Sequence, residues 1–261
     1  MILCSNPSEQ FKSYQSEIEQ AVLSVMRSNS YILGEQVTLL EKEFAYYIGT
    51  SSAIGVANGT DAIEISLRAL NIGHGDEVIT VSHTAVATVA AIEATGAKAV
   101  LIDVEKNFYT LNPIHLEQVL SKNTKAVVLV HLYGNAADLE PVKIFCSSNN
   151  LFLIEDASQS AGAKYKNRYA GSWGDFSAFS LNPMKPLGAF GEAGILVFNN
   201  KKYLDKIKSL RYLGTKNIEV CVDPDINHKI DEIQSLWLIE RLKDLDNLLR
   251  KRRKIAKSLS K

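Results

Sequence analysis

The 261-residue sequence has no excess of charge of either sign, since lysine plus arginine and aspartate plus glutamate both number 29. A chain without net charge has no global field to hold nucleic acid or an anionic membrane, so a local site must capture any anionic ligand. Cysteine is scarce. Cys4, Cys146 and Cys221 are far apart and lack CxxC or Cys/His spacing, which argues against a disulfide framework and against a metal site. We interpret them as reduced thiols of a cytoplasmic protein.

Other absences narrow the class further. No apolar run approaches the roughly 18 residues that a membrane helix needs, and no signal sequence opens the chain, which predicts a soluble protein without a membrane role. The Walker lysine motif and GxGxxG are also missing, which counts against the common nucleotide-binding domains. Hydrophobic residues make up 46% of the sequence, enough to bury a full-sized core.

Short β-branched runs alternate with helical patterns over residues 52–198, which is typical of a parallel sheet wrapped by helices. Runs such as AVVLVH and LFLIED lack apolar/polar alternation, which predicts strands covered on both faces. The predicted strands are Ser52–Val56, Glu77–Val81, Ala99–Asp103, Ala126–His131, Phe152–Asp156, Phe176–Phe179 and Ile195–Phe198.

Helices are predicted where apolar residues recur at three- and four-residue spacing. One contains Val37 and Tyr47 and ends near Gly49. The others are predicted at Thr60–Leu70, Tyr203–Arg211 and Asp231–Ser258.

The first motif is Asn58-Gly59-Thr60-Asp61, which follows a predicted strand and opens a helix. Gly59 lets the backbone approach closely, and the free N–H groups of a helix N-terminus hold a phosphate without a lysine. Thr60 can add a hydroxyl. The same residue types are favoured as a simple helix cap, so the motif alone leaves both interpretations open.

The second motif is Glu155-Asp156-Ala157-Ser158-Gln159, at the carboxyl end of an apolar strand, where ligands bind in open α/β sheets. The Asp156 carboxylate could pair with the protonated pyridine nitrogen of a cofactor and keep it an electron sink. Gln159 could hydrogen bond to the ring substituents. The alternative is that Asp156 only caps the following turn.

The third motif runs from Phe179 through Ser180 to Lys185 and into the glycine-rich stretch GAFGEAG. A lysine held in a packed turn can present the neutral amine that imine formation needs. Ser180 is close enough in sequence to reach the same phosphate. Taken alone, Lys185 could equally be a solvated loop lysine, because lysine is common and usually exposed.

Several blocks stand together in one order: YILGEQVTLLEKEFAYYIG, VANGTDAIEISLRAL, GDEVIT, HTAVATVAAIEATGAKAVLIDV, HLYGNAADLEPV, IEDASQSAGAKYKNRYAGSWGDFSAFSLNPMKPLGAFGEAGILVFNN, RYLGT and INHKIDEIQSLWL. In this the sequence resembles the DegT/StrS family of sugar-nucleotide aminotransferases, over nearly its whole length. The resemblance implies the large domain of fold type I pyridoxal-phosphate enzymes. That domain is an α/β fold with a seven-stranded, mostly parallel (mixed) sheet sandwiched by helices.

The resemblance also implies roles by position. Lys185 would form the Schiff base with pyridoxal 5'-phosphate and move the proton between the two imine carbons. Asp156 would face the pyridine nitrogen, and Gln159 the ring hydroxyl.

The phosphate would be held by Gly59, Thr60 and Ser180 of one subunit and by Asn227 of the neighbouring subunit. Asn227 lies within the INHKIDEIQ block. A homodimer with shared active sites is therefore implied.

The activity implied is transfer of an amino group from glutamate to a nucleotide-linked keto sugar, in amino-sugar biosynthesis for a surface polysaccharide or a related glycan. Two other hypotheses remain: a truncated, catalytically silent remnant that still binds the cofactor, and a nucleotide-binding α/β domain without covalent chemistry.

Departures from the family pattern bear on the site. Where many members place an aromatic ring on the cofactor, this sequence has Ala85, so either His83 takes that contact or the stacking is weaker. Asn182 stands where many members have histidine, and Lys229 where arginine is usual. Retention of Lys185 argues against the dehydratase branch, in which histidine replaces it.

Family members also continue past this length into a smaller domain. We expect residues 1–240 to be the cofactor-binding large domain with an N-terminal helical segment. Residues 241–261 would begin the helix toward a missing or truncated small domain.

Two features have no assigned role. His131 ends a predicted strand and is either catalytic or a structural histidine bonded at the strand end. The basic run Arg250-Lys251-Arg252-Arg253-Lys254 resembles a nucleic-acid patch, but it also suits a solvated helix end that complements the helix dipole.

Overall fold

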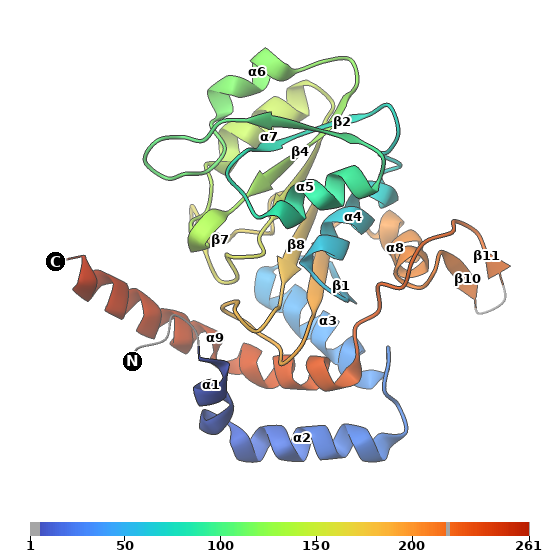
Figure 1. Ribbon diagram of the computed structural model, residues 1–261, viewed down its shortest axis with the longest axis vertical. Helices are drawn as coiled ribbons and strands as arrows, with labels where there is room; N and C mark the ends of the chain where they lie inside the picture. Colours follow the sequence, from blue (N-terminus) through green and yellow to red (C-terminus); the bar gives the residue numbers. More distant parts are fainter. Residues whose placement is uncertain (1–5, 218–219, 261) are drawn as a thin grey trace.

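Seven strands form one sheet at the centre of the fold (Figure 1). The computed structural model describes residues 6–217 and 220–260. The strand order is β1-β9-β8-β5-β4-β2-β3; β9 is antiparallel to both neighbours, and the other pairs are parallel. The strands are β1 (Ser52–Val56), β2 (Glu77–Val81), β3 (Lys98–Ile102), β4 (Thr124–Val130), β5 (Phe152–Asp156), β8 (Phe176–Ser180) and β9 (Gly194–Phe198). The mostly parallel, mixed sheet expected from the sequence is confirmed. Compared with the predicted bounds, β3 lies one residue earlier, β4 begins two residues earlier and ends one earlier, β8 ends one residue later and β9 begins one residue earlier.

Helices cover both faces of the sheet, which explains why its strands lack alternation. Along β1, Ile54 and Val56 face a core packed under α4 (Gly59–Ala69), α5 (Val86–Ala94) and α8 (Leu204–Arg211), whereas Ala53 faces the opposite side.

The opposite face is divided between two helix pairs. Beneath β1, β9 and β8 lie α3 (Glu35–Ile48) and α9 (Glu232–Leu259). Beneath β4 and β2 lie α6 (Leu116–Val119) and α7 (Leu139–Ser148).

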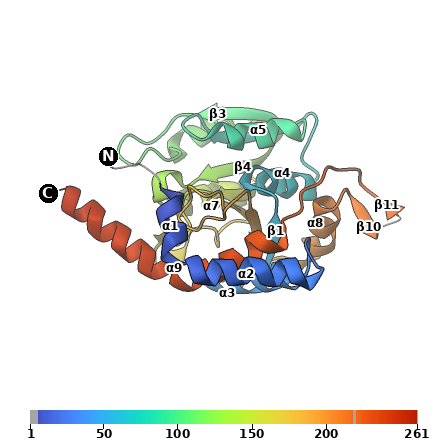
Figure 2. The same cartoon turned by 60° about the horizontal axis from the view of Figure 1, so that its bottom comes forward.

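The N-terminal helices α1 (Pro7–Ser13) and α2 (Gln15–Ser28) lie outside these layers, with α2 against α9 (Figure 2). Tyr14, the residue between α1 and α2, donates a hydrogen bond to Asp244 of α9 at 2.7 Å. The helical character expected for the N-terminal segment is present.

Glu232, at the first position of α9, joins that helix to α3. Its buried carboxylate accepts hydrogen bonds from the backbone N–H groups of Gly34, Gln36 and Val37 at 2.8, 3.0 and 3.0 Å. A carboxylate at this place satisfies the free donors of the α3 N-terminus and complements the helix dipole.

Two hairpins outside the main sheet were not predicted from the sequence. They pair β6 (Lys164–Tyr165) with β7 (Arg168–Tyr169), and β10 (Thr215–Asn217) with β11 (Val220–Cys221); the second projects beside α8 (Figure 1). Short 3-10 turns complete the fold at η1 (Pro113–His115), η2 (Leu132–Gly134) and η3 (Lys201–Tyr203).

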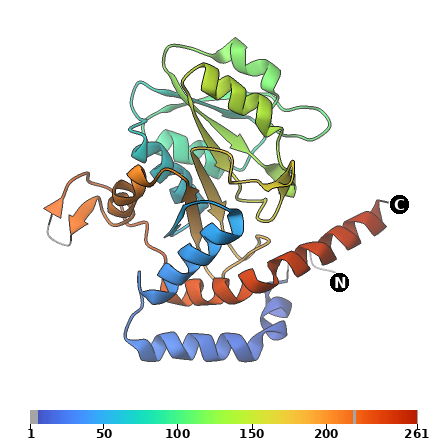
Figure 3. The same cartoon turned by 180° about the vertical axis from the view of Figure 1, so that it is seen from behind.

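Helix α9 runs unbroken through the domain boundary expected after residue 240, and its C-terminal half extends beyond the sheet and its covering helices (Figure 3). Among residues 6–217 and 220–260, no helix combines the length and apolarity that a bilayer crossing needs. Cys146 is buried and Cys221 exposed, both as free thiols, while Cys4 lies outside the described residues.

Candidate active site

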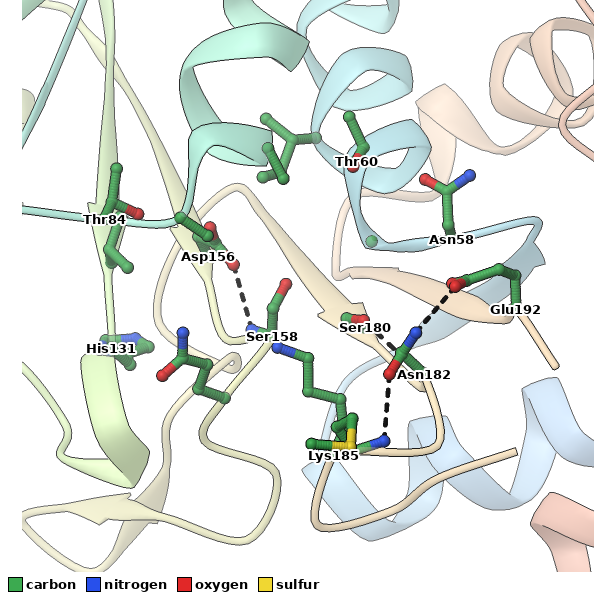
Figure 4. A pocket seen from close by; sticks show the side chains of 17 residues that line it. Asn58, Thr60, Thr84, His131, Asp156, Ser158, Ser180, Asn182, Lys185 and Glu192 are labelled. Atoms are coloured by element: carbon green, nitrogen blue, oxygen red, sulfur yellow. Dashed lines mark hydrogen bonds between the residues drawn. The ribbon is translucent and has the colours of Figure 1, made fainter. Parts of the chain in front are cut away.

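A cavity of about 260 Å³ lies at the carboxyl edge of the sheet, beside the N-terminus of α4 (Figure 4). The ends of three neighbouring strands contribute Val130, Asp156 and Ser180 to its lining. In open α/β sheets this edge is where ligands bind, because loops and helix N-termini meet there.

Most of the residues predicted for the site meet at this cavity. Seven of the nine line it: Gly59, Thr60, Ala85, Asp156, Gln159, Ser180 and Lys185. Residues from position 59 to position 185 are thus brought to one place by the parallel strand order.

The turn before α4 presents a helix N-terminus to the cavity. Asn58 caps the helix, because its side-chain oxygen accepts a hydrogen bond from the N–H of Asp61 at 2.8 Å. Helix geometry leaves the N–H groups of Gly59 and Thr60 without a partner inside the helix. The cap interpretation of this motif is therefore confirmed; the cap leaves these two N–H groups available, and anion binding at them stays a prediction.

Two glycines allow this turn to sit against the sheet. A Cβ on Gly59 would lie 2.8 Å from the Cβ of Ser180, and a Cβ on Gly194 would lie 2.3 Å from the carbonyl carbon of Asn58. Such contacts are too short for real side chains, so glycine is required for the close approach. The approach places the hydroxyl of Ser180 beside the helix N-terminus.

The Asp156 carboxylate is only 5% exposed and is held at both oxygens. Oδ2 accepts a hydrogen bond from the Thr88 hydroxyl at 2.8 Å, and Oδ1 accepts one from the N–H of Ser158 at 3.1 Å. Asp156 therefore caps its turn and faces the cavity at once. Thr84 lies 2.8 Å from Thr88, hydroxyl to hydroxyl, and extends this chain of bonds.

Thr88 and Ser158 were missed as site residues by the sequence reasoning. A signal for Thr88 exists, because Thr84 and Thr88 are one helical turn apart in HTAVAT at the start of a predicted helix. The spacing alone does not name their carboxylate partner.

Glu155 points to the other side of the strand and is completely buried. Burial alone would raise the pKa of Glu155, but the hydrogen bond from His131 and backbone N–H groups of Gly171 and Gly174 outweigh it and hold the pKa below its usual value. These backbone hydrogen bonds connect the loop after β7 to Glu155 near the end of β5.

His131 has both ring nitrogens engaged within the protein. Nδ1 accepts a hydrogen bond from the N–H of Ala137 at 3.1 Å, so Nε2 carries the proton and donates to Glu155 at 2.9 Å. The ring lines the cavity and is fully buried, but these bonds assign it a structural role.

Lys185 enters the cavity from a tight loop after β8. Asn182 fixes this loop: its carbonyl oxygen accepts from the Lys185 N–H at 2.8 Å, and its side-chain oxygen accepts from the Met184 N–H at 3.0 Å. Its side-chain amide donates to Glu192 at 2.7 Å, across the mouth of the glycine-rich stretch. In Figure 4 the Lys185 side chain extends into the cavity toward Ser158.

Gln159 is oriented by the neighbouring turn. Its side-chain oxygen accepts a hydrogen bond from the N–H of Tyr133 at 2.9 Å. This bond leaves the amide nitrogen as the end that can donate to a ligand in the cavity.

His83 and Asn227 are the two predicted residues that do not line the cavity. His83 is exposed, and its Nε2 lies 3.1 Å from the Tyr133 hydroxyl. Asn227 is also exposed, and its side-chain oxygen accepts from the N–H of Lys229 at 3.2 Å. Their roles at the cofactor remain predictions.

A buried charge cluster lies beside the turn before α4. The fully buried imidazole of His228 has Nδ1 2.8 Å from Asp61 of α4 and Nε2 3.3 Å from Asp225. Burial works to lower the pKa of His228, but the two carboxylates outweigh it and raise the pKa to about 9. His228 is thus a cation that offsets the negative charge of Asp61 at the helix end where an anion would bind.

Comparison with known proteins identifies the family of the chain. The sequence profile of the DegT/DnrJ/EryC1/StrS aminotransferase family matches residues 12–261. The chain is 40% identical over 243 residues to the dTDP-3-amino-3,6-dideoxy-alpha-D-galactopyranose transaminase of Aneurinibacillus thermoaerophilus, which covers 93% of this chain and 67% of the relative.

Solved structures give the same picture. S. venezuelae DesV, in complex with a ketimine intermediate, superposes with a TM-score of 0.90 at 35% identity, over 93% of this chain and 65% of that one. NtdA of Bacillus subtilis, with bound cofactor PMP, superposes with a TM-score of 0.84 at 29% identity, over 89% of this chain and 53% of that one. The chain spans about two thirds of the length of most relatives it matches.

Proposed function

The chain belongs to the DegT/DnrJ/EryC1/StrS aminotransferase family, and on that premise we propose that it uses pyridoxal phosphate to transfer an amino group from glutamate to a keto group on a nucleotide-linked sugar. One observation carries the proposal. The amine-bearing side chain of Lys185, the fixed carboxylate of Asp156 and the N-terminus of α4 all converge on a single cavity.

The lining residues fit the cofactor by their chemistry. A phosphate suits the α4 N-terminus, where Gly59 and Gly194 leave room for close approach and the hydroxyl groups of Thr60 and Ser180 stand beside it. A protonated ring nitrogen suits the Asp156 carboxylate, and an aldehyde suits the amine of Lys185. Among the residues described, no group of three metal ligands competes with this assignment.

When bound, the cofactor supplies an electron sink for the negative charge that develops on the amino-bearing carbon of the donor. Lys185 would accept and return a proton at Nζ, and Asn182 fixes the backbone of the loop that carries it. Asp156 keeps its charge facing the ring, because Thr88 and the N–H of Ser158 hold its two oxygens. Gln159 would donate from its amide nitrogen to the ring hydroxyl.

The proposal extends to assembly and pathway. Asn227 is exposed and lies outside the cavity of its own subunit, which supports a role at the phosphate of a second copy in a homodimer. We place the reaction in amino-sugar biosynthesis for a surface polysaccharide or a related glycan. Residues 1–240 would form the cofactor-binding domain, and residues 241–261 would lead toward a smaller one.

Titration of the purified chain with pyridoxal phosphate tests the proposal. We expect a change in cofactor absorbance that disappears in Lys185→Ala, and borohydride trapping should place the cofactor on the peptide that contains Lys185. Adding glutamate should then release 2-oxoglutarate in stoichiometric amount.

The exposed Lys202→Ala variant is the matched control, because Lys202 lies on η3, away from the cavity. Labelling of another lysine, or absorbance that persists in Lys185→Ala, would refute the assignment. Cofactor attachment without release of 2-oxoglutarate would refute the catalytic part and favour the silent remnant.

A further inference from the structure

A second cavity, of about 370 Å³, adjoins the first on the far side of Lys185. The two cavities share Gln159, Met184 and Lys185 in their linings. The wall of the second cavity that faces Lys185 is formed by α9, through Leu249, Arg252 and Arg253. We refer to it as the arginine cavity.

The position of α9 at this wall is fixed by the loop that follows Asp156. Gly162 has a positive φ of 83°, and a Cβ there would lie 2.2 Å from Cδ1 of Leu249, so the helix packs directly on the glycine. Arg253 donates a hydrogen bond from Nη2 to the Gly162 carbonyl oxygen at 3.1 Å. These two contacts hold the neighbouring Arg252 at the cavity.

The arginine cavity is cationic although the chain as a whole carries no net charge. Its lining holds Lys185, Arg252 and Arg253, and no aspartate or glutamate from the described residues is among it. The basic run on α9 is exposed, as expected for a solvated helix end, and two of its members, Arg252 and Arg253, also line the cavity. A guanidinium group presents paired donors that match an anion with two oxygen atoms.

The turn at Tyr133 forms the rim between the two cavities. Tyr133 lines the arginine cavity with a positive φ of 58°, which is uncommon for a residue with a side chain and marks a place where the surrounding structure imposes the conformation. Its N–H holds Gln159, which lines both cavities. A ligand could therefore extend from one cavity into the other along Gln159 and Lys185.

We propose that the arginine cavity is the subsite for the anionic oxygens of a reactant, held by Arg252 and Arg253 while the reacting carbon lies at Lys185. The proposal rests on the proposed function and names the part of its substrates that this side of the site recognises. Both reactants carry such an anion: the donor has carboxylates, and the acceptor has the diphosphate of the nucleotide.

Binding of two unreactive probes tests the proposal and separates these sources. Glutarate represents the donor carboxylates, and dTDP represents the diphosphate. Calorimetry on the full chain with pyridoxal phosphate present compares wild type, Arg252→Gln, Arg252→Lys and the control Lys254→Gln. Lys254 carries the same charge on the same helix and is exposed like Arg252, but it does not line the cavity.

We expect Arg252→Gln to weaken at least one probe by roughly ten- to a hundredfold, as loss of a charged hydrogen-bonding group does. Arg252→Lys should lose part of the affinity, and Lys254→Gln should change it by less than about twofold because that charge makes no direct contact with a ligand in the cavity. Weakening of glutarate alone assigns the cavity to the donor, weakening of dTDP alone assigns it to the acceptor, and weakening of both makes it common to the two half-reactions.

The proposal is overturned if wild type binds neither probe, if Arg252→Gln binds both as wild type does, or if Lys254→Gln has an equal effect. Its failure is distinguishable from failure of the proposed function, which is measured by covalent attachment at Lys185. Anion binding that depends on Arg252 in a chain that attaches no cofactor would refute the aminotransferase and keep the anion site.

Discussion

Replacing His228 by glutamine should lower the free energy of unfolding by about 3 kcal/mol near pH 6.5. The imidazole has no exposed surface, and its nitrogens lie 2.8 Å from Asp61 and 3.3 Å from Asp225. Glutamine fills a similar space but carries no charge, so both carboxylates lose their cation. Arg68, with Nε 3.8 Å from Asp225, compensates only that one. Removing one partner of a buried ion pair typically destabilises a protein by about 3–5 kcal/mol.

The pH dependence of stability gives a second estimate of the contribution of His228 to the free energy of unfolding. The pKa of His228 is raised from 6.5 to about 9 in the folded chain. Because the folded pKa is raised, the stabilisation is fully present below pH 6.5 and is lost as the pH rises through about 9. A rise of this size, at about 1.4 kcal/mol for each pH unit, also corresponds to roughly 3 kcal/mol.

Urea unfolding of wild type and His228→Gln at pH 6 to 9.5 measures the effect. The difference between the two free energies of unfolding should be largest at low pH and should shrink toward pH 9.5. His74→Gln, at an exposed histidine, serves as control and should follow wild type throughout. A difference that stays constant over this range would show that His228 acts by packing and not by charge, and the reasoning would be wrong.

Three further predictions follow from the site and its supports. Asp156→Asn should still attach the cofactor at Lys185 but release 2-oxoglutarate on the order of a hundredfold more slowly, because the charge facing the ring is gone; unchanged single-turnover kinetics would contradict this. Gly194→Ala should weaken pyridoxal phosphate binding by more than about tenfold, since its Cβ would displace the Asn58 carbonyl 2.3 Å away, and equal dissociation constants in a titration would argue against a rigid turn. Glu232→Gln should lower stability by roughly 1–2 kcal/mol in urea, because the α3 N-terminus loses its carboxylate, and a neutral result would remove that contact from the account of the fold.

The elements that sequence reasoning located are those whose pattern is local. β1, β2 and β5 begin and end where their apolar runs do. β3 lies one residue earlier than predicted; Lys98 and Leu101 are exposed in it, so burial marks its ends less clearly. β4 begins two residues earlier, because its first residues, Thr124 and Lys125, are polar and stand outside the apolar run. The bounds of α2 were not predicted from the sequence, although Ile18, Val22 and Val25 recur at helical spacing; Ile18 and Val25 are its buried residues.

The site residues also fall into two groups: those that a local pattern predicts, and those whose partners lie far away in the sequence. Asp156 stands at a strand end, Gly59 at a helix start and Lys185 in the short loop after β8, places where the chain order itself predicts a shared edge. Thr88 and His228 could not be assigned, because their partners Asp156 and Asp61 lie far away in sequence and are chosen by packing. The role of Arg252 likewise depends on the docking of α9 at Gly162, which no local pattern encodes.

The single antiparallel strand has a consequence for the order in which the protein can fold. Within the described chain, β1 sits at the sheet edge and pairs with β9 alone. During synthesis, β1 therefore cannot form its strand pairing until residues 194–198 of β9 have left the ribosome. Contacts so distant along the chain form slowly, and an unpaired strand is prone to mispairing in the interval. The turn after β1, which would bind the cofactor phosphate, is thus expected to form late. We therefore expect cofactor binding to follow the synthesis of β9.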